Sequence, residues 1–261
     1  MHFYYHQDAT RNVGSHLQNL EIGIPLEING QRITRVTKFN FLGIQLSSTL
    51  SWKIHTDYIC SKIRKNVGIL RHLKNLVPQK TLKMIYSTLI HSHLSYGILA
   101  WGFSPGHVIT LQKQAVRAVT NANSYAHAEP IFKTLEILAV PEISILRGPK
   151  FYYDLKHNQV PAYFKAMFQQ RVEVHGYNTR GSQNIHVNPA RTQGATQCLR
   201  FYIPDVIEKL NDSILSKVQT HSPDGFAGYA KKFLLDQYRG SDEPCDNANC
   251  NQCRPQPGAA P

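Results

Sequence analysis

Hydrophobic and polar residues alternate along the first part of the chain in the period of a strand. Apolar side chains fall at every second position from Leu20 to Ile28, and Asn29-Gly30 follows as a two-residue hairpin turn. The pattern predicts a strand ending at Ile28, a partner over residues 31–36 and a third short strand over residues 39–46. Three short strands with one apolar face need a covering layer. We therefore expect either that the following helices cover them or that they form the edge of a larger sheet.

From Ser51, a plausible N-cap, the apolar spacing changes to that of a helix. The first predicted helix has an apolar stripe at Trp52, Ile59, Ile63, Val67, Leu70 and Leu73, and places Lys65, Gly68 and His72 on the opposite side. A second helix is predicted over residues 79–95, with Leu82, Ile85, Tyr86, Leu89, Ile90 and Leu94 inward and Lys80, Lys83, Ser87 and His91 outward. A third helix is predicted over residues 107–121, where Lys113 and Arg117, four residues apart, share the exposed face.

The remaining chain predicts short helices that have proline near their first turn, and a final amphipathic helix. Their expected ranges are 130–138, 141–157, 161–170, 204–210 and 226–238, with an irregular stretch over 175–202 and an unstructured tail after Gly240. The fold class predicted is mainly α with a small β element. The expected division is 1–50 for the strands, 51–125 for the basic helices, 126–240 for a mixed helix and loop region, and 241–261 for the tail.

Charge narrows the range of partners. The chain has 29 Lys and Arg against 17 Asp and Glu, a formal net charge of +12. Residues 32–117 alone contain thirteen basic residues and one acid, Asp57. Five histidines in this span (His55, His72, His91, His93 and His107) could add further charge at mildly acid pH. So large an excess of basic residues in one segment favours a polyanionic partner, RNA or DNA, over a charged surface that serves only solubility.

The lack of a secretory signal or membrane span in the sequence predicts an intracellular protein, cytoplasmic or nuclear. Residues 1–7 lack the order of a secretory signal, and the most apolar window, 82–101, is interrupted by serines and histidines. Cysteine is sparse, as in a reducing compartment. We expect no membrane partner.

Catalytic patterns are missing from the sequence. Nucleotidyl transfer needs paired carboxylates to hold two divalent metals, but the only adjacent acids are Asp242-Glu243 near the end of the chain. The letters Gly-x-Ser-x-Gly occur once, at residues 102–106, but they fall in the break before the helix predicted over 107–121 and not at the strand-to-helix turn that a nucleophile elbow needs. Phosphate-cradling glycine loops and His-Glu-x-x-His are absent. His91 and His93, two apart on a helix, point in different directions and are expected to be packed or surface side chains. The chain is therefore predicted to have no catalytic residues, no small-molecule substrate and no enzymatic activity on its own.

The tail contains Cys245, Cys250 and Cys253 at intervals that suit zinc. A fourth Cys or His does not follow, although His221, Asp242 or Asp246 would supply a fourth ligand. Two interpretations stay open, a partial zinc site and an unstructured cysteine-bearing tail.

Several short motifs in order resemble the region after the catalytic core of LINE-type (non-LTR) retrotransposon reverse transcriptases. They are Ile28-Asn29-Gly30, Phe41-Leu42-Gly43, Leu50-Ser51-Trp52-Lys53-Ile54-His55, Tyr96-Gly97, Trp101-Gly102 and Leu111 to Arg117. Weaker similarity continues through Pro130-Ile131-Phe132, residues 135–140 and Tyr177-Asn178-Thr179-Arg180. The resemblance is broadest over residues 28–120.

The resemblance implies a primer grip at Phe41, Leu42 and Gly43 and a helical thumb after Trp52. A thumb follows a duplex backbone without reading sequence, and so needs Lys and Arg on helical faces. The expected phosphate contacts are Lys62, Lys65, Lys113 and Arg117, followed by Arg64 and Arg71. Trp52 and His55 are interpreted as packing residues in preference to base-stacking ones. Magnesium would serve the parent enzyme, whose catalytic Asp-Asp strand would lie upstream of Met1.

Two explanations of the missing core remain, a truncated copy of the element and a partial gene model of a longer polyprotein. The function expected is that of a fragment of an RNA-directed DNA polymerase that binds nucleic-acid duplexes non-specifically. The alternative is a host-adapted RNA-binding or protein-interaction module derived from the element.

Overall fold

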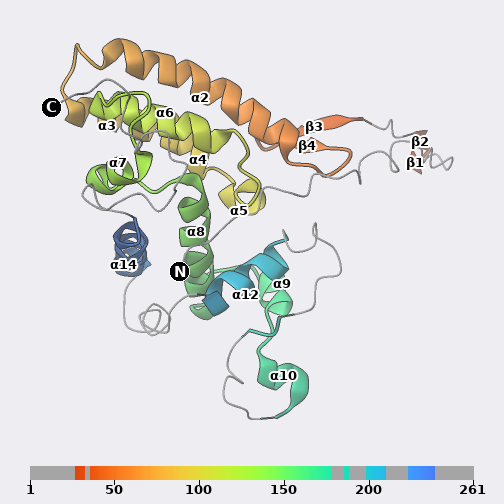
Figure 1. The fold of residues 1–261 in the computed structure, drawn as a ribbon. Helices are drawn as coiled ribbons and strands as arrows, with labels where there is room; N and C mark the ends of the chain where they lie inside the picture. The colour runs from red at the N-terminus through yellow and green to blue at the C-terminus, as the bar shows by residue number, and fades with distance from the viewer. Residues whose placement is uncertain (1–26, 33–35, 178–184, 188–197, 210–222, 239–261) are drawn as a thin grey trace, which may run out of the picture. The chain divides into compact units, whose positions relative to one another are not determined.

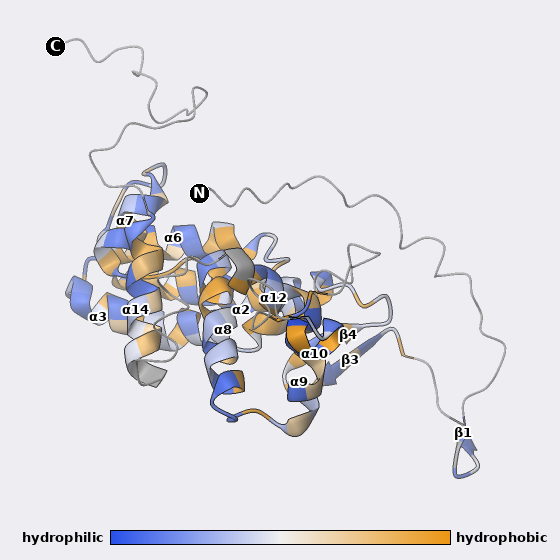
Figure 2. Cartoon of the chain, turned by 90° about the horizontal axis from the view of Figure 1, so that it is seen from below, coloured by the Kyte–Doolittle hydropathy of each residue, from blue (hydrophilic) through white to orange (hydrophobic). Residues whose placement is uncertain are grey.

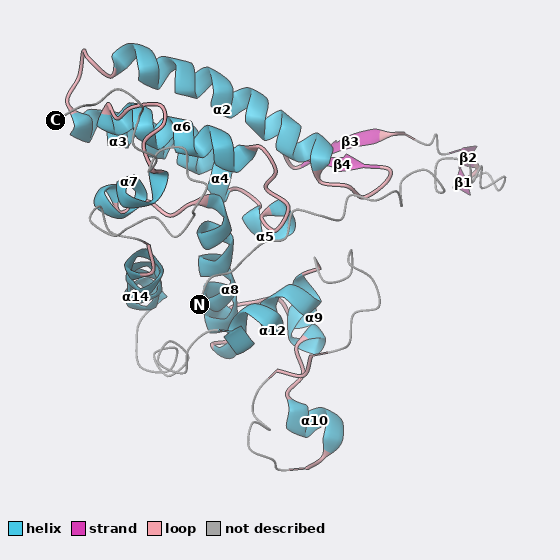
Figure 3. Ribbon diagram, viewed as in Figure 1, coloured by secondary structure: helices cyan, strands magenta, loops and turns pink. Residues whose placement is uncertain are grey.

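The computed structural model describes residues 27–32, 36–177, 185–187, 198–209 and 223–238. The chain divides into two compact units, residues 1–55 and 56–261, and each is described by itself. Among the described residues, strands occur only between 27 and 47, and helices account for most of the rest (Figure 3). This confirms the predicted fold class, mainly α with a small β element. No helix in these ranges is both long and apolar enough to cross a membrane.

The first strand pair confirms the predicted turn. Strands β1 (Glu27–Ile28) and β2 (Gln31–Arg32) pair in antiparallel register around Asn29-Gly30. Both turn residues have positive φ, 51° and 76°, as a type I′ turn requires. The rest of the two predicted strands, residues 20–26 and 33–35, lies outside the described residues.

The third predicted strand is wrong, because residues 39–46 form a second hairpin. Strands β3 (Lys38–Phe41) and β4 (Ile44–Ser47) pair antiparallel, with Phe41 opposite Ile44. Leu42 and Gly43 make the turn, at φ of 48° and 80°. Phe-Leu-Gly gives no polar turn signal, so the apolar alternation on both sides of the turn looks like one continuous strand.

The β3–β4 hairpin exposes its apolar face. Directly opposed residues share a face, so Phe39 with Leu46 and Phe41 with Ile44 form one side. Phe39 and Phe41 are each 55% exposed. On the other face Gln45 and Ser47 are buried. The side of the hairpin that the sequence would place in a core is therefore the side that meets solvent.

Helix α2 (Lys53–Leu73) follows the predicted pattern. Ile59, Ile63, Val67 and Leu70 are buried, whereas Lys65, Gly68 and His72 are exposed. Ser51 Oγ accepts the Lys53 N–H at 3.3 Å near the start of the helix. The predicted amphipathic helix is confirmed, and so is the prediction of which of its faces is buried and which is exposed.

Residues 79–95 form one helix with a widened turn in its middle. Helix α3 (Gln79–Tyr86) runs into the π-helix η1 (Ser87–His91) and then α4 (Ser92–Ser95). The Ser87 and Ser92 hydroxyls donate to the carbonyls of Lys83 and Thr88, four residues earlier, a pattern that loosens helices. The wide turn shifts the register: Ile90 and Leu94 stay buried, whereas Leu89, predicted inward, is exposed.

A short bend follows and leads into α5 (Ile98–Trp101) and α6 (Val108–Thr120). Trp101 is fully buried, and its indole N–H donates to the Tyr96 carbonyl at 2.9 Å. A Cβ at Gly102 would come within 2.6 Å of the Ile98 carbonyl oxygen, so only glycine fits there. The Tyr96-Gly97 and Trp101-Gly102 pairs thus shape the bend that the sequence predicted.

The C-terminal half is built around α8 (Val140–Lys156), which packs against α12 (Leu199–Lys209) and α14 (Pro223–Asp236). The other elements are α7 (Ala128–Leu135), α9 (Ala162–Met167) and α10 (Arg171–His175) (Figure 1). Helices in the predicted places are confirmed, but α12 begins at Leu199 and contains Pro204 in its interior. Each of the long helices carries both hydrophobic and hydrophilic residues (Figure 2).

Candidate nucleic-acid interface

The solvent-facing side of α2 brings together four of the predicted binding residues. Lys62, Arg64, Lys65 and Arg71 are all exposed. Arg64 and Arg71 are seven residues apart, two helical turns, and therefore lie one above the other along the helix. Lys65 and His72 repeat the same spacing on the next row. The basic groups therefore spread across the exposed face and do not form a single file.

Asp57 is the only acid of α2 and is exposed near its start. Lys62 Nζ lies over the Tyr58 ring at 5.4 Å from its centroid, so part of its alkyl stem is held against the helix surface. The charge itself stays at the surface, where a phosphate can reach it.

Arg71 connects α2 to α6. Its guanidinium donates to the Gln114 side-chain oxygen at 3.1 Å. Lys113, the neighbour of Gln114 on α6, is exposed. This hydrogen bond holds the part of α6 that contains Lys113 next to the C-terminal half of α2. Sequence reasoning did not identify Gln114, because an exposed-looking glutamine gives no signal of a tertiary contact.

Arg117 has a different environment from the one predicted. It is half-buried, and its Nε donates to the Ala126 carbonyl at 2.7 Å, which ties α6 to the loop before α7. Burial lowers the pKa of its guanidinium from the ordinary value. The expectation that Lys113 and Arg117 share one exposed face is therefore wrong for Arg117. Its assignment as a phosphate contact remains untested.

Phe41, Leu42 and Gly43 belong to the other unit, the one of residues 1–55. Leu42 stands at the tip of the β3–β4 turn and is 73% exposed. The structure thus shows an exposed hairpin turn at the residues that resemble a primer grip. Whether they hold a primer stays a prediction.

Trp52 and His55 make local contacts at the start of α2. The rings pack edge to face with centroids 6.3 Å apart, and the His55 Nδ1 accepts the Gln45 N–H at 3.2 Å. His55 is buried, which lowers its pKa. These contacts agree with the packing interpretation of both residues, since the bond from Gln45 joins β4 to His55 within the unit of residues 1–55.

Two of the five histidines are poor sources of extra positive charge. Burial lowers the pKa of both His55 and His91, and for His91 the neighbouring charges of Lys231 and Arg147 lower it further. We therefore expect these two histidines to contribute less positive charge at mildly acid pH than an exposed histidine would.

The predicted zinc ligands Cys245, Cys250 and Cys253 lie outside the described residues. Within the described ranges no cluster of three or more His, Cys, Asp or Glu side chains is arranged to hold a metal ion. The zinc and magnesium expectations stay untested.

Comparison with known proteins supports a relationship to reverse transcriptases. The chain is 26% identical over 137 residues to the probable RNA-directed DNA polymerase from transposon BS of Drosophila melanogaster. That stretch covers 50% of this chain and 15% of the relative's length. No family model matches the chain, and no solved structure matches it.

Proposed function

We propose that this chain is the part of a LINE-type reverse transcriptase that follows the catalytic core, and that α2 and α6 bind the phosphate backbone of duplex nucleic acid without reading its sequence. The observation that carries the proposal is the exposed surface of α2, where five lysines and arginines, the four predicted ones and Lys53, face solvent with Asp57 as the only acid of the helix. The similarity to a transposon polymerase supports the choice of nucleic acid as the anion.

The spacing of the basic residues along α2 suits contacts with the phosphate backbone of a duplex. Lys62 and Arg71 are nine residues apart, about 14 Å along the helix axis. Duplex DNA carries about eight phosphate charges over that length. Lysine and arginine side chains on a helix surface position a backbone but do not read bases, so the binding is expected to be insensitive to sequence.

The test is fluorescence anisotropy of a labelled duplex with the full chain at rising salt concentration. The triple variant Lys62→Gln/Lys65→Gln/Lys113→Gln is expected to bind more weakly and to lower the slope of log K against log salt by about 2–3, since each lost phosphate contact removes about 0.9. Arg117 is left unchanged in this variant because its side chain also holds a loop.

A matched control removes the same charge elsewhere. Lys156, Lys165 and Lys232 are exposed in the C-terminal half, and their change to Gln should leave the salt slope within about 0.5 of the unmodified chain. Equal losses in both triple variants would show that net charge alone drives binding. Salt-independent binding, or none, would refute the proposal.

We also propose that the chain does not polymerise DNA by itself. Support comes from the sequence, in which Asp57 is the only acid among residues 32–117, and two divalent metals would need several. Primer extension with the full chain, magnesium and deoxynucleotides should give no product above background. Magnesium-dependent extension that is lost with chelator would contradict this.

The hairpin favours a second candidate function, a protein-interaction module. Its exposed face carries Phe39, Phe41 and Leu46 in register, a surface that burial against another protein would stabilise. The test is sedimentation velocity over a range of concentrations. Self-association that Phe39→Thr/Phe41→Thr removes, with duplex affinity unchanged, would support this function, whereas a monomer at every concentration would count against it.

A further inference from the structure

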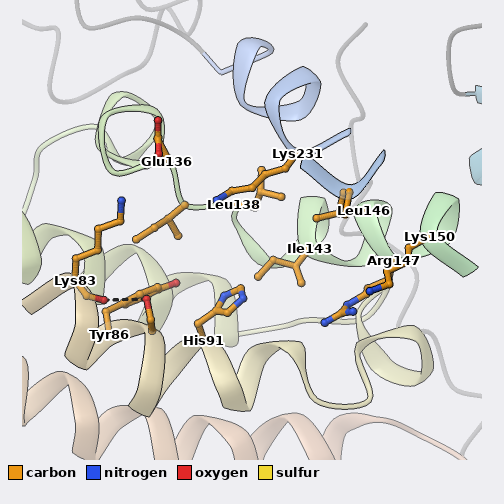
Figure 4. A pocket seen from close by; sticks show the side chains of 13 residues that line it. Lys83, Tyr86, His91, Glu136, Leu138, Ile143, Leu146, Arg147, Lys150 and Lys231 are labelled. Atoms are coloured by element: carbon orange, nitrogen blue, oxygen red, sulfur yellow. Dashed lines mark hydrogen bonds between the residues drawn. The ribbon is translucent and has the colours of Figure 1, made fainter. Parts of the chain in front are cut away.

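A cavity of about 290 Å³ lies among three helices of the larger unit, and none of the basic residues of α2 lines it. Each helix contributes residues at helical spacing. Ser87 and His91 come from η1, Arg147 and Lys150 from α8, and Lys231 from α14. Lys83 of α3 and Glu136 complete the charged lining (Figure 4).

The lining carries excess positive charge. Lys83, Arg147, Lys150 and Lys231 give four fixed cations against one carboxylate, that of Glu136. All four cations are half-buried, whereas Glu136 is exposed. Within the part of the chain that the structure describes, none of the four forms an ion pair or donates a side-chain hydrogen bond. Like charges held together and partly out of water destabilise one another unless an anion joins them.

The π-helix shapes this cavity. Its wide turn ends at His91, whose side chain lies between the Tyr86 and Arg147 sides of the pocket (Figure 4). In a regular helix His91 would lie on the outward face that the sequence predicts. π-Turns occur frequently at functional sites. Arg147 of α8 and Lys231 of α14 line the same pocket as His91, and their charges lower its pKa beyond the effect of burial.

We propose that this pocket binds the multiply charged phosphate group of a small organic di- or triphosphate. A monoanion would leave most of the four cations uncompensated, whereas a diphosphate or triphosphate matches them. The volume is at the low end for ligand sites and too small for a duplex. Ile143, Leu146 and Ala227 form an apolar wall on which the organic part of the ligand can rest.

The proposal goes beyond duplex binding and uses different residues. It is tested by isothermal titration of the full chain with ADP and, separately, with inorganic tripolyphosphate, without divalent metal and at physiological salt. We expect one saturable site. Arg147→Gln/Lys231→Gln should weaken binding by at least tenfold and leave duplex affinity within twofold.

The matched control is Lys65→Gln/Lys113→Gln, which removes the same charge from the proposed duplex surface and should leave ADP affinity within twofold. Equal losses in the two double variants, or no saturable binding to the unmodified chain, would overturn the proposal. If the pocket variant fails to fold, Arg147→Lys should retain affinity and Lys150→Gln should reduce it severalfold; no difference between these two would also overturn it.

A 5′-phosphorylated oligonucleotide identifies the source of the phosphate. If it competes with ADP and its 5′-hydroxyl counterpart does not, the pocket takes the end of a nucleic-acid strand, and the assignment to a small organic phosphate is overturned. Failure of both oligonucleotides to compete supports a small molecule. If the unmodified chain does not bind the duplex, the proposed function is refuted, but the outcome of the ADP titration is not affected.

Discussion

The Nε of Arg117 donates to the Ala126 carbonyl at 2.7 Å, so a residue that the sequence predicts to contact phosphate holds the loop between α6 and α7. A guanidinium has five donors, and the fixed bond leaves the others for a ligand. The same side chain can therefore affect both stability and binding. These effects have to be measured separately.

Replacing Arg117 by Met should lower the free energy of unfolding by about 1–3 kcal/mol, because a charge-assisted hydrogen bond is lost and the Ala126 carbonyl loses its donor. Urea denaturation measures this. Lys113→Met, four residues away and exposed, is the control and should change stability by less than about 0.5 kcal/mol. Equal stability of the Arg117 and Lys113 variants would contradict the structural role of Arg117.

Gln112 forms a buried network that joins α6 to the segment before α8. Its Nε2 donates to Tyr86 Oη and to the Leu138 carbonyl, each at 2.9 Å, and its Oε1 accepts the Val140 N–H at 2.9 Å. Gln112→Leu keeps the volume but leaves two backbone groups unpaired. We expect a loss of about 2–4 kcal/mol.

Thermal or urea unfolding checks this loss, with two controls. Tyr86→Phe removes one partner only and should cost about 1 kcal/mol. Gln114→Leu, on the same helix, loses a bond to the exposed Arg71 and should cost less than that. A Gln112→Leu variant as stable as Gln114→Leu would show that the network contributes little.

The helices were predictable because an apolar stripe at Ile59, Ile63, Val67 and Leu70 repeats at the helical period, and burial follows that stripe. The exposed cations of α2 were predictable for the same reason. Local spacing determines which way a residue on a regular helix faces. It does not determine which distant residue lies beside it.

Arg117 and the pocket show what such spacing cannot reveal. The partner of Arg117 is a backbone carbonyl nine residues away, and backbone carbonyls have no sequence signature. Lys83, Arg147 and Lys231 lie far apart in the sequence and meet only through helix packing. The π-turn at Ser87–His91 changes the register in a way that a fixed 3.6-residue period misses, so the sequence pattern placed His91 on the outward face of its helix.

Leu42 occupies a backbone conformation that disfavours leucine. At φ 48° it precedes Gly43 in the tip of the hairpin, where Asn-Gly is the preferred pair. Leu42→Asn should stabilise the hairpin by about 1 kcal/mol. Slower amide hydrogen exchange in residues 38–47 would show this. Gly43→Ala should act in the opposite direction.

The same variant tests the primer-grip assignment. If the exposed Leu42 side chain contacts nucleic acid, Leu42→Asn should weaken affinity for a primer-template duplex severalfold although the hairpin is more stable. Unchanged affinity together with slower exchange would remove Leu42 from the predicted binding residues. Loss of affinity with faster exchange would mean that the turn prefers leucine for a structural reason, contrary to the strain argument.

His55 and His91 should make stability depend on pH. Burial lowers the pKa of each in the folded chain, whereas both titrate near 6.5 when unfolded. Below that value the unfolded chain binds more protons, so stability is complete above about pH 7 and falls as pH decreases through 6.5. The cations Lys83, Arg147, Lys150 and Lys231 around His91 strengthen the effect, and Glu136 opposes it.

Urea denaturation at pH 7.5, 6.0 and 5.0 measures the slope of the free energy of unfolding against pH. His55→Asn keeps an acceptor for the Gln45 N–H, and His91→Gln keeps a polar side chain in the pocket; each should flatten the slope. His72→Gln removes an exposed histidine and should not flatten it.

Glu142 affects stability in the opposite direction. Burial raises its pKa, so its contribution to the stability of the folded chain is lost as pH rises. Glu142→Gln should therefore steepen the net fall toward acid pH, and a flat profile in this variant, in which the opposing carboxylate is gone, would contradict the assignment of both histidines.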